Sequence, residues 1–122
     1  MRQGFIKIVA AGLTLTGCSF AARSAEMYRK DTRELLATRN GDLDACYETA
    51  HDKDKSLAGT VVVRFTLESD TGKIVDTKVL EGDTTAPEPL QQCVLDSLEG
   101  LALKPGDERQ GDATFTWKFE QQ

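Results

Sequence analysis

The sequence contains few of the residues on which several classes of function depend. One of its 122 residues is histidine, three are proline, and 15 Lys and Arg stand against 20 Asp and Glu. A single histidine excludes a metal site with two histidine ligands, and the net charge of −5 argues against the basic surface that a nucleic-acid-binding protein needs. The 39% of hydrophobic and 29% of charged residues are nevertheless typical of a chain that folds as one globular domain.

Motifs of catalytic and nucleotide-binding sites are also missing. The glycines lack the spacing of a phosphate-binding loop, and neither a nucleophile elbow nor an S-x-x-K motif occurs. Asp44, Glu48, His51 and Asp52 have helical spacing and could hold a cation, but a solvated acidic helix face is the simpler interpretation. The sequence therefore predicts a protein that is not an enzyme and that has no cofactor and no metal.

The N-terminal segment has the features of a bacterial export signal. Two basic residues precede an apolar run of nine residues, 8–16, whereas a membrane-spanning helix needs roughly twenty. The run ends in Leu-Thr-Gly-Cys at 15–18, which resembles the lipobox of bacterial lipoproteins, in which the cysteine receives diacylglycerol before cleavage. We therefore expect a signal peptide over residues 1–17 and a lipid anchor on Cys18.

Cleavage before Cys18 would change the size and charge of the chain. Loss of seventeen residues and two positive charges from 122 residues leaves 105 residues with a net charge of −7. Such an acidic chain does not adsorb to anionic lipid, so membrane attachment would depend on the acyl chains. An aspartate directly after the lipidated cysteine is a sorting signal for retention in bacteria. Ser19 occupies this position here, which predicts the outer membrane. Residues 18–25 would be the lipidated cysteine with a short tether, followed by one domain over 26–122.

Helical and strand periodicities alternate along this domain. Apolar residues recur with helical spacing over 26–53, as one helix or as two that are separated near Gly41, and a second helical segment begins near Thr85 and Glu88, which could form a capping box. Three segments alternate between apolar and polar side chains, as half-buried strands do: 60–68, 73–81 and 112–120. A turn at 70–72 would join the first two strands.

The element order α-β-β-α-β predicts an α+β fold. Its three strands would form an antiparallel sheet, and its two helical segments would pack on one face of that sheet.

Several segments of this domain together resemble a known protein family. They are the run Cys46-Tyr47-Glu48, the strand from Leu57 to Leu67, the segment Gly72 to Val75, the pair Cys93-Val94, and the alternating aromatic residues at 115–119. They resemble the AgmX/PglI-type C-terminal domain, which is similar to the C-terminal domain of TonB, over about residues 39–120. The segment 103–106 departs from the family, which has an aromatic-proline pattern there. The resemblance implies a binding or scaffolding module of the cell envelope.

The two cysteines that remain after lipidation of Cys18 form an even pair in an oxidising compartment. The redox compartment and the family resemblance together imply a disulfide between Cys46 and Cys93, which would link the first helical segment to the second. The alternative is that both side chains are small buried hydrophobic groups.

In the TonB-like family the last strand lies at a sheet edge and accepts an extended peptide. The corresponding strand here is Ala113–Phe119, which would offer a partner its backbone together with Thr114, Thr116 and Lys118. Natural sheet edges also use charged residues to prevent pairing, so an edge protected by Lys118 and Glu120 is the alternative.

A TonB-type energy transducer has a transmembrane helix and a long proline-rich spacer, whereas this chain has three prolines and a short tether. We therefore expect a non-enzymatic envelope lipoprotein that faces the periplasm and acts as a protein-interaction or structural module of a motility or transport complex. A ligand-binding module for peptidoglycan or a small molecule is the alternative.

Overall fold

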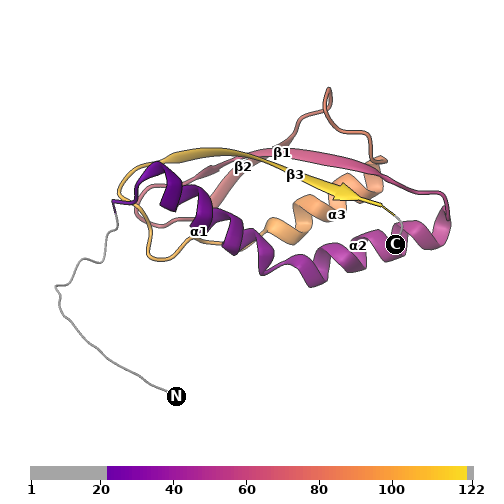
Figure 1. The fold of residues 1–122 in the computed structure, drawn as a ribbon, viewed down its shortest axis with the longest axis horizontal. Coiled ribbons are helices and arrows are strands. Elements are labelled where there is room, and N and C mark those ends of the chain that lie inside the picture. The colour runs from indigo at the N-terminus through magenta and orange to yellow at the C-terminus, as the bar shows by residue number, and fades with distance from the viewer. Residues whose placement is uncertain (1–21, 121–122) are drawn as a thin grey trace, which may run out of the picture.

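The computed structural model describes residues 22–120, so Cys18 and the predicted signal peptide lie outside the described residues. Three helices and three strands follow one another along the chain (Figure 1): α1 (Ala25–Ala37), α2 (Asn40–Lys53), β1 (Gly59–Leu67), β2 (Ile74–Val79), α3 (Glu88–Leu98) and β3 (Gly111–Phe119). The predicted α+β class is confirmed, and the first helical segment consists of two helices.

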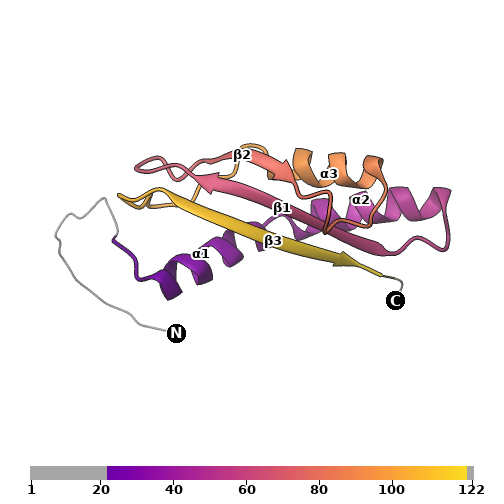
Figure 2. The ribbon, with the colours of Figure 1, turned by 90° about the horizontal axis from the view of Figure 1, so that it is seen from above.

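The strands form one antiparallel sheet in the order β2-β1-β3, with β1 in the centre. β1 and β3 pair without interruption over nine residues, from Gly59 opposite Phe119 to Leu67 opposite Gly111. The three helices lie on the same side of the sheet, below it in Figure 1, and Figure 2 shows the other side, which no helix covers.

The core lies between the sheet and the helices. Val61, Val63, Phe65 and Leu67 of β1 are buried, as their alternation with polar residues predicted. They pack in one cluster with apolar residues of all three helices and of β3: Leu36, Leu43, Cys46, Leu90, Val94, Leu98, Trp117 and Phe119. Burial of this apolar surface, at about 25 cal/mol per Å², is the main force that holds the helices on the sheet.

The break between α1 and α2 lies before Gly41, at Thr38 and Arg39. The hydroxyl of Thr38 donates to the carbonyl of Leu35 at 2.6 Å, and this side-chain bond competes with continuation of the helix. Gly41 itself lies in the first turn of α2, so the break is set by the residues that precede it.

The predicted capping box of α3 is not formed. Pro87 is the N-cap residue of α3 and makes no side-chain bond to the helix. The hydroxyl of Thr85 accepts instead from the backbone N–H of Thr60 in β1, at 2.9 Å. The connection between β2 and α3 is therefore hydrogen-bonded to the start of β1.

The predicted turn between β1 and β2 is present. Gly72 has a φ of +70°, and a side chain there would overlap the carbonyl of Leu103, whose N–H donates to the Gly72 carbonyl at 2.7 Å. The segment at 103–106, which departs from the family pattern, thus begins by packing against this turn.

Candidate protein-binding edge

The two outer strands of the sheet differ in regularity. β2 has six residues, its register against β1 shifts between Arg64 and Thr66, and Asp76 has a positive φ of 55°. Such a bulge twists an edge away from a potential partner. β3 has nine residues in unbroken register, and its outer edge pairs with no strand of residues 22–120, although Figure 2 shows α1 on that side of its first half. β3 is therefore the more regular template for a further strand.

The backbone bonds of β1 determine which groups of β3 face outward. Thr60 and Val62 bond to the connection between β2 and α3: the Thr85 N–H donates to the Thr60 carbonyl at 3.0 Å, the Leu80 N–H donates to the Val62 carbonyl at 2.8 Å, and the Thr84 hydroxyl accepts from the Val62 N–H at 3.0 Å. The even-numbered residues of β1 therefore direct their N–H and C=O groups away from β3.

In an antiparallel ladder the N–H and C=O of one residue point to the same neighbour, and this direction alternates along the strand. The odd-numbered residues of β1 thus bond to β3, where their partners in register also carry odd numbers. The even-numbered residues of β3 consequently direct their backbone groups to the free edge. They are Asp112, Thr114, Thr116 and Lys118, and they include the three predicted partner-binding residues.

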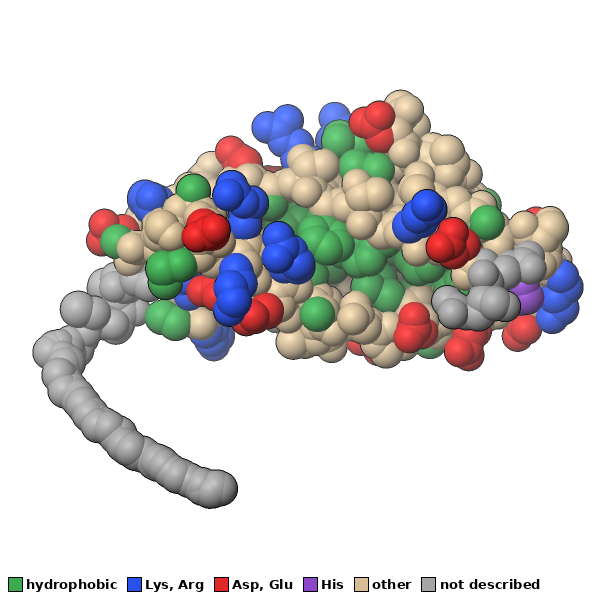
Figure 3. Space-filling view, in the orientation of Figure 1, with side chains coloured by type: hydrophobic (Ala, Val, Ile, Leu, Met, Phe, Trp, Pro, Cys, Tyr) green, Lys and Arg blue, Asp and Glu red, His purple; other side chains and the backbone are tan. Residues whose placement is uncertain are grey.

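A groove follows this edge on the side of the helices. It has a volume of about 510 Å³ and lies between α1 and the first half of β3, with Tyr28, Thr32 and Phe115 among its lining residues. Figure 3 shows hydrophobic side chains gathered in the hollow between β3 and the helices below it. Because Ala113 and Phe115 are only partly buried, apolar surface is left at the side of the groove. A strand added to β3 could place side chains in this groove.

Two arginines of the groove wall have no ion-pair partner among residues 22–120. Arg29 and Arg33 lie four residues apart on α1, so they occupy one face of the helix, and both side chains are exposed. Lys30 on the adjacent face is paired with Glu34 at 3.0 Å. The groove wall therefore carries two uncompensated positive charges.

A buried ionic cluster holds the N-terminal end of the domain beside this groove. The carboxylate of Asp107 is fully buried and accepts from the backbone N–H groups of Arg23 and Arg109, each at 2.9 Å, and from Arg109 Nε at 3.1 Å. The Arg109 side-chain bond and these backbone N–H groups hold the pKa of Asp107 well below its usual range. Arg23 is also 2.7 Å from Asp31 of α1, and its Nη2 donates to the carbonyl of Pro105 at 2.8 Å. Arg23, which the sequence assigned to the tether, thus belongs to the domain.

Tyr28 connects this cluster to the edge strand. The centre of its ring lies 6.0 Å from the guanidinium carbon of Arg23 and 5.9 Å from that of Arg109, and its hydroxyl donates to the Arg109 carbonyl at 3.1 Å. The ring also lies so close to Gly111 that a β-carbon there would overlap it. Burial, and then the charge of Asp107, raises the pKa of the Tyr28 hydroxyl, so it remains protonated and able to donate at neutral pH.

Cys46 and Cys93 form a disulfide in the structure, consistent with the prediction. The bond joins α2 to α3, with the two α-carbons 5.8 Å apart. A second groove, of about 620 Å³, runs between these helices and is lined by both cysteines together with Ala45, Ala50, Leu57 and Pro89. None of its described lining residues is aromatic.

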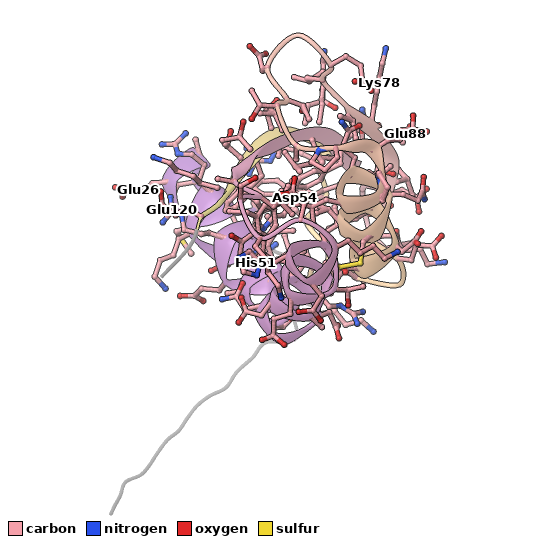
Figure 4. The ribbon with its side chains drawn as sticks, turned by 90° about the vertical axis from the view of Figure 1, so that its right-hand side faces the viewer. Glu26, His51, Asp54, Lys78, Glu88 and Glu120 are labelled. Atoms are coloured by element: carbon pink, nitrogen blue, oxygen red, sulfur yellow. A yellow bond between two sulfur atoms is a disulfide. The ribbon has the colours of Figure 1, made fainter. Side chains whose placement is uncertain are left out.

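The acidic residues of α2 do not converge on a cation site. Asp44, Glu48 and Asp52 are exposed, and the His51 ring packs against the Tyr47 ring with centroids 5.5 Å apart. Figure 4 looks at this end of the molecule, where His51 and Asp54 lie apart from the labelled acidic residues of other elements. Residues 22–120 contain no group of three His, Cys, Asp or Glu side chains that could hold a metal ion.

No family model, curated protein or solved structure matches the chain. Among the helices of residues 22–120, none combines the length and the apolar composition that a membrane span requires.

Proposed function

We propose that this chain is a non-enzymatic lipoprotein of a bacterial envelope whose β3 edge binds an extended segment of a partner protein. In this proposal Cys18 carries the lipid anchor, the domain faces the periplasm, most simply from the outer membrane, and the protein is an interaction module of a motility or transport complex. The resemblance to the AgmX/PglI-type C-terminal domain and the lipobox support the envelope location.

The observation that carries the binding proposal is the free edge of β3 beside a groove. Four residues direct backbone donors and acceptors outward along this edge, and strand addition uses such groups for affinity and adjacent pockets for specificity. The charged residues Asp112 and Lys118 lie near the two ends of β3, whereas Thr114 and Thr116 occupy its centre. The middle of the edge therefore lacks the charges, prolines and bulges that prevent edge pairing in other proteins.

The groove between α2 and α3 gives the alternative function, ligand binding, less support than the β3 edge gives to partner binding. A module for peptidoglycan or another saccharide would use aromatic faces, and the described lining of this groove has none. Its apolar wall, formed by Ala45, Leu57 and Pro89, would accept a small apolar molecule. The ligand-binding alternative therefore remains for a small apolar ligand.

A proline at position 116 tests the proposed edge. The Thr116 N–H points away from β1, so Thr116→Pro removes a donor that a partner would use without removing a bond of the sheet. Proximity labelling from the anchored protein should identify envelope proteins that depend on this donor. These should be labelled by the wild-type protein and by Thr116→Ala, which keeps the N–H, and should be lost from Thr116→Pro.

Circular dichroism and the presence of the disulfide would establish that Thr116→Pro is folded. If the folded variant labels the same proteins as Thr116→Ala, strand addition at β3 is not the binding mode.

A further inference from the structure

We infer that the groove beside β3 selects partner segments with an acidic side chain, placed next to the start of β3, and an apolar side chain two residues away from it. This inference rests on the proposed function, since it concerns the segment that would add to the β3 edge. It assigns the selection to Arg29 and Arg33.

The other arginines around the groove are paired and these two are not, and the carboxylate of Asp112 in the lining accepts from the Thr66 hydroxyl at 2.9 Å. Arg23 is paired with Asp31 and Asp107, and Arg109 is paired with Asp107. Arg29 and Arg33 line the groove and form no ion pair within residues 22–120. Exposed charges act mainly over a Debye length of about 8–10 Å, so these two arginines set the local preference although the whole chain is acidic.

The alternation of an added strand determines which of its side chains meet the arginines. Side chains next to odd-numbered residues of β3 lie on the helix side of the sheet, and those next to even-numbered residues lie on the uncovered side. The side chain beside Ala113 would therefore enter the groove, where Arg29 and Arg33 form the opposite wall. Two residues further, about 7 Å along the strand, the next groove-facing side chain would meet Phe115.

A second copy of this chain does not satisfy the pattern with its own β3. The carboxylates of the strand and its end, Asp112 and Glu120, have even numbers, and the groove-facing positions of 111–119 contain no acidic residue. Two β3 strands paired antiparallel, edge to edge, would leave Arg29 and Arg33 without a carboxylate from either strand. The charge pattern thus favours a different protein as the partner.

Selection from a random peptide display library tests this specificity. The probes are nine-residue peptides, and the protein is the full chain purified in detergent. Three forms are compared: the wild type, the double variant Arg29→Gln with Arg33→Gln, and the double variant Arg64→Gln with Lys78→Gln. The last variant is the matched control, because it removes two exposed positive charges from β1 and β2, away from the groove.

The wild type and the control should select peptides with Asp or Glu two residues from an apolar residue. The double arginine variant should lose the acidic preference and bind a selected peptide roughly fivefold more weakly, the order expected for two exposed ion pairs. Peptides enriched without an acidic preference, or equal weakening in the control, would overturn the inference.

Two further measurements test the edge and the arginines separately. Thr116→Pro should bind none of the selected peptides. If it binds every peptide that the wild type enriches, the proposed edge itself is wrong. Phosphatidylglycerol vesicles serve as the lipid probe. They are offered to the Cys18→Ser forms of the wild type and of the arginine variant, which lack the proposed acyl chains, and neither form should bind them. If the arginine variant loses vesicle binding and keeps peptide binding, the two arginines recognise lipid and the inference fails.

Discussion

Asp107→Asn should strongly destabilise the fold, because Asp107 is the common partner of two arginines in a buried cluster. Its side chain is fully buried, and that of Arg23 has an exposed fraction of only 4%. Arg23 Nη1 is buried without a hydrogen bond and lies 3.8 Å from a carboxylate oxygen of Asp107. Removal of this charge leaves the Arg23 guanidinium with Asp31 alone.

The magnitude follows from the exposure of each partner. Loss of one member of a buried ion pair costs about 3–5 kcal/mol, because the other charge remains uncompensated. Arg109 has an exposed fraction of 53% and can turn to water, whereas Arg23 cannot. We therefore expect the lower end of this range, about 3 kcal/mol in the free energy of unfolding. For a domain of this size that corresponds to a fall in Tm on the order of 15 °C.

The measurement is urea unfolding at pH 7 and at lower pH, with Glu108→Gln as the matched control. Glu108 is the adjacent exposed carboxylate, and its substitution should change stability by less than about 0.5 kcal/mol. Since folding lowers the pKa of Asp107, its contribution is complete above the unfolded value of about 3.9 and is lost as the pH falls below it. The wild type and Asp107→Asn should therefore begin to converge in stability below about pH 4, and the difference should shrink further as the pH falls toward the lowered pKa of Asp107 in the folded protein. Equal stability of wild type and Asp107→Asn at pH 7 would refute the assigned role of the cluster.

Two further predictions concern the cysteines. Cys46→Ser with Cys93→Ser should lower the free energy of unfolding by about 4 kcal/mol, because the disulfide closes a loop over a separation of 47 residues and so reduces the chain entropy of the unfolded state. Thiol counting on the denatured, unreduced wild type should detect neither of these two thiols, and detection of both would contradict the disulfide. Cys18→Ser should move the protein from the membrane fraction to the soluble fraction, because the acyl chains would be its anchor; retention of the variant after a high-salt wash would contradict lipid anchoring.

Much of the sheet could be predicted from the sequence, because each strand has one apolar and one polar face. The inward residues of β1 and the position of Gly72 followed from local patterns that tertiary contacts reinforce. The capping box did not form, because the Thr85 hydroxyl bonds to the backbone of Thr60, 25 residues away in sequence. Local propensity cannot anticipate such a competitor.

The groove and its surroundings depend on contacts that no sequence pattern marks. Arg23 and Asp107 are separated by 84 residues, and neither lies in a periodic segment that would indicate burial. Arg29 and Arg33 have the spacing of a helix face, but only the position of α1 below β3 identifies that face as the wall of a groove. The signal that could have indicated them is the absence of an acidic residue four positions away from either arginine.

The ionic cluster also relates the binding edge to the proposed anchor. Arg23 is fixed to the domain five residues after Cys18, so the covalent chain allows at most about 17 Å between their α-carbons. Through Tyr28 and Arg109 the same cluster contacts the chain at the start of β3, whereas Phe119 stacks on Tyr47 of α2 at the other end. If Cys18 carries the lipid, the end of the edge at Gly111 lies nearer the bilayer than the end at Phe119. A partner segment would then place its acidic side chain at the membrane-proximal end of β3, and disruption of the cluster by Asp107→Asn would weaken this placement as well as the fold.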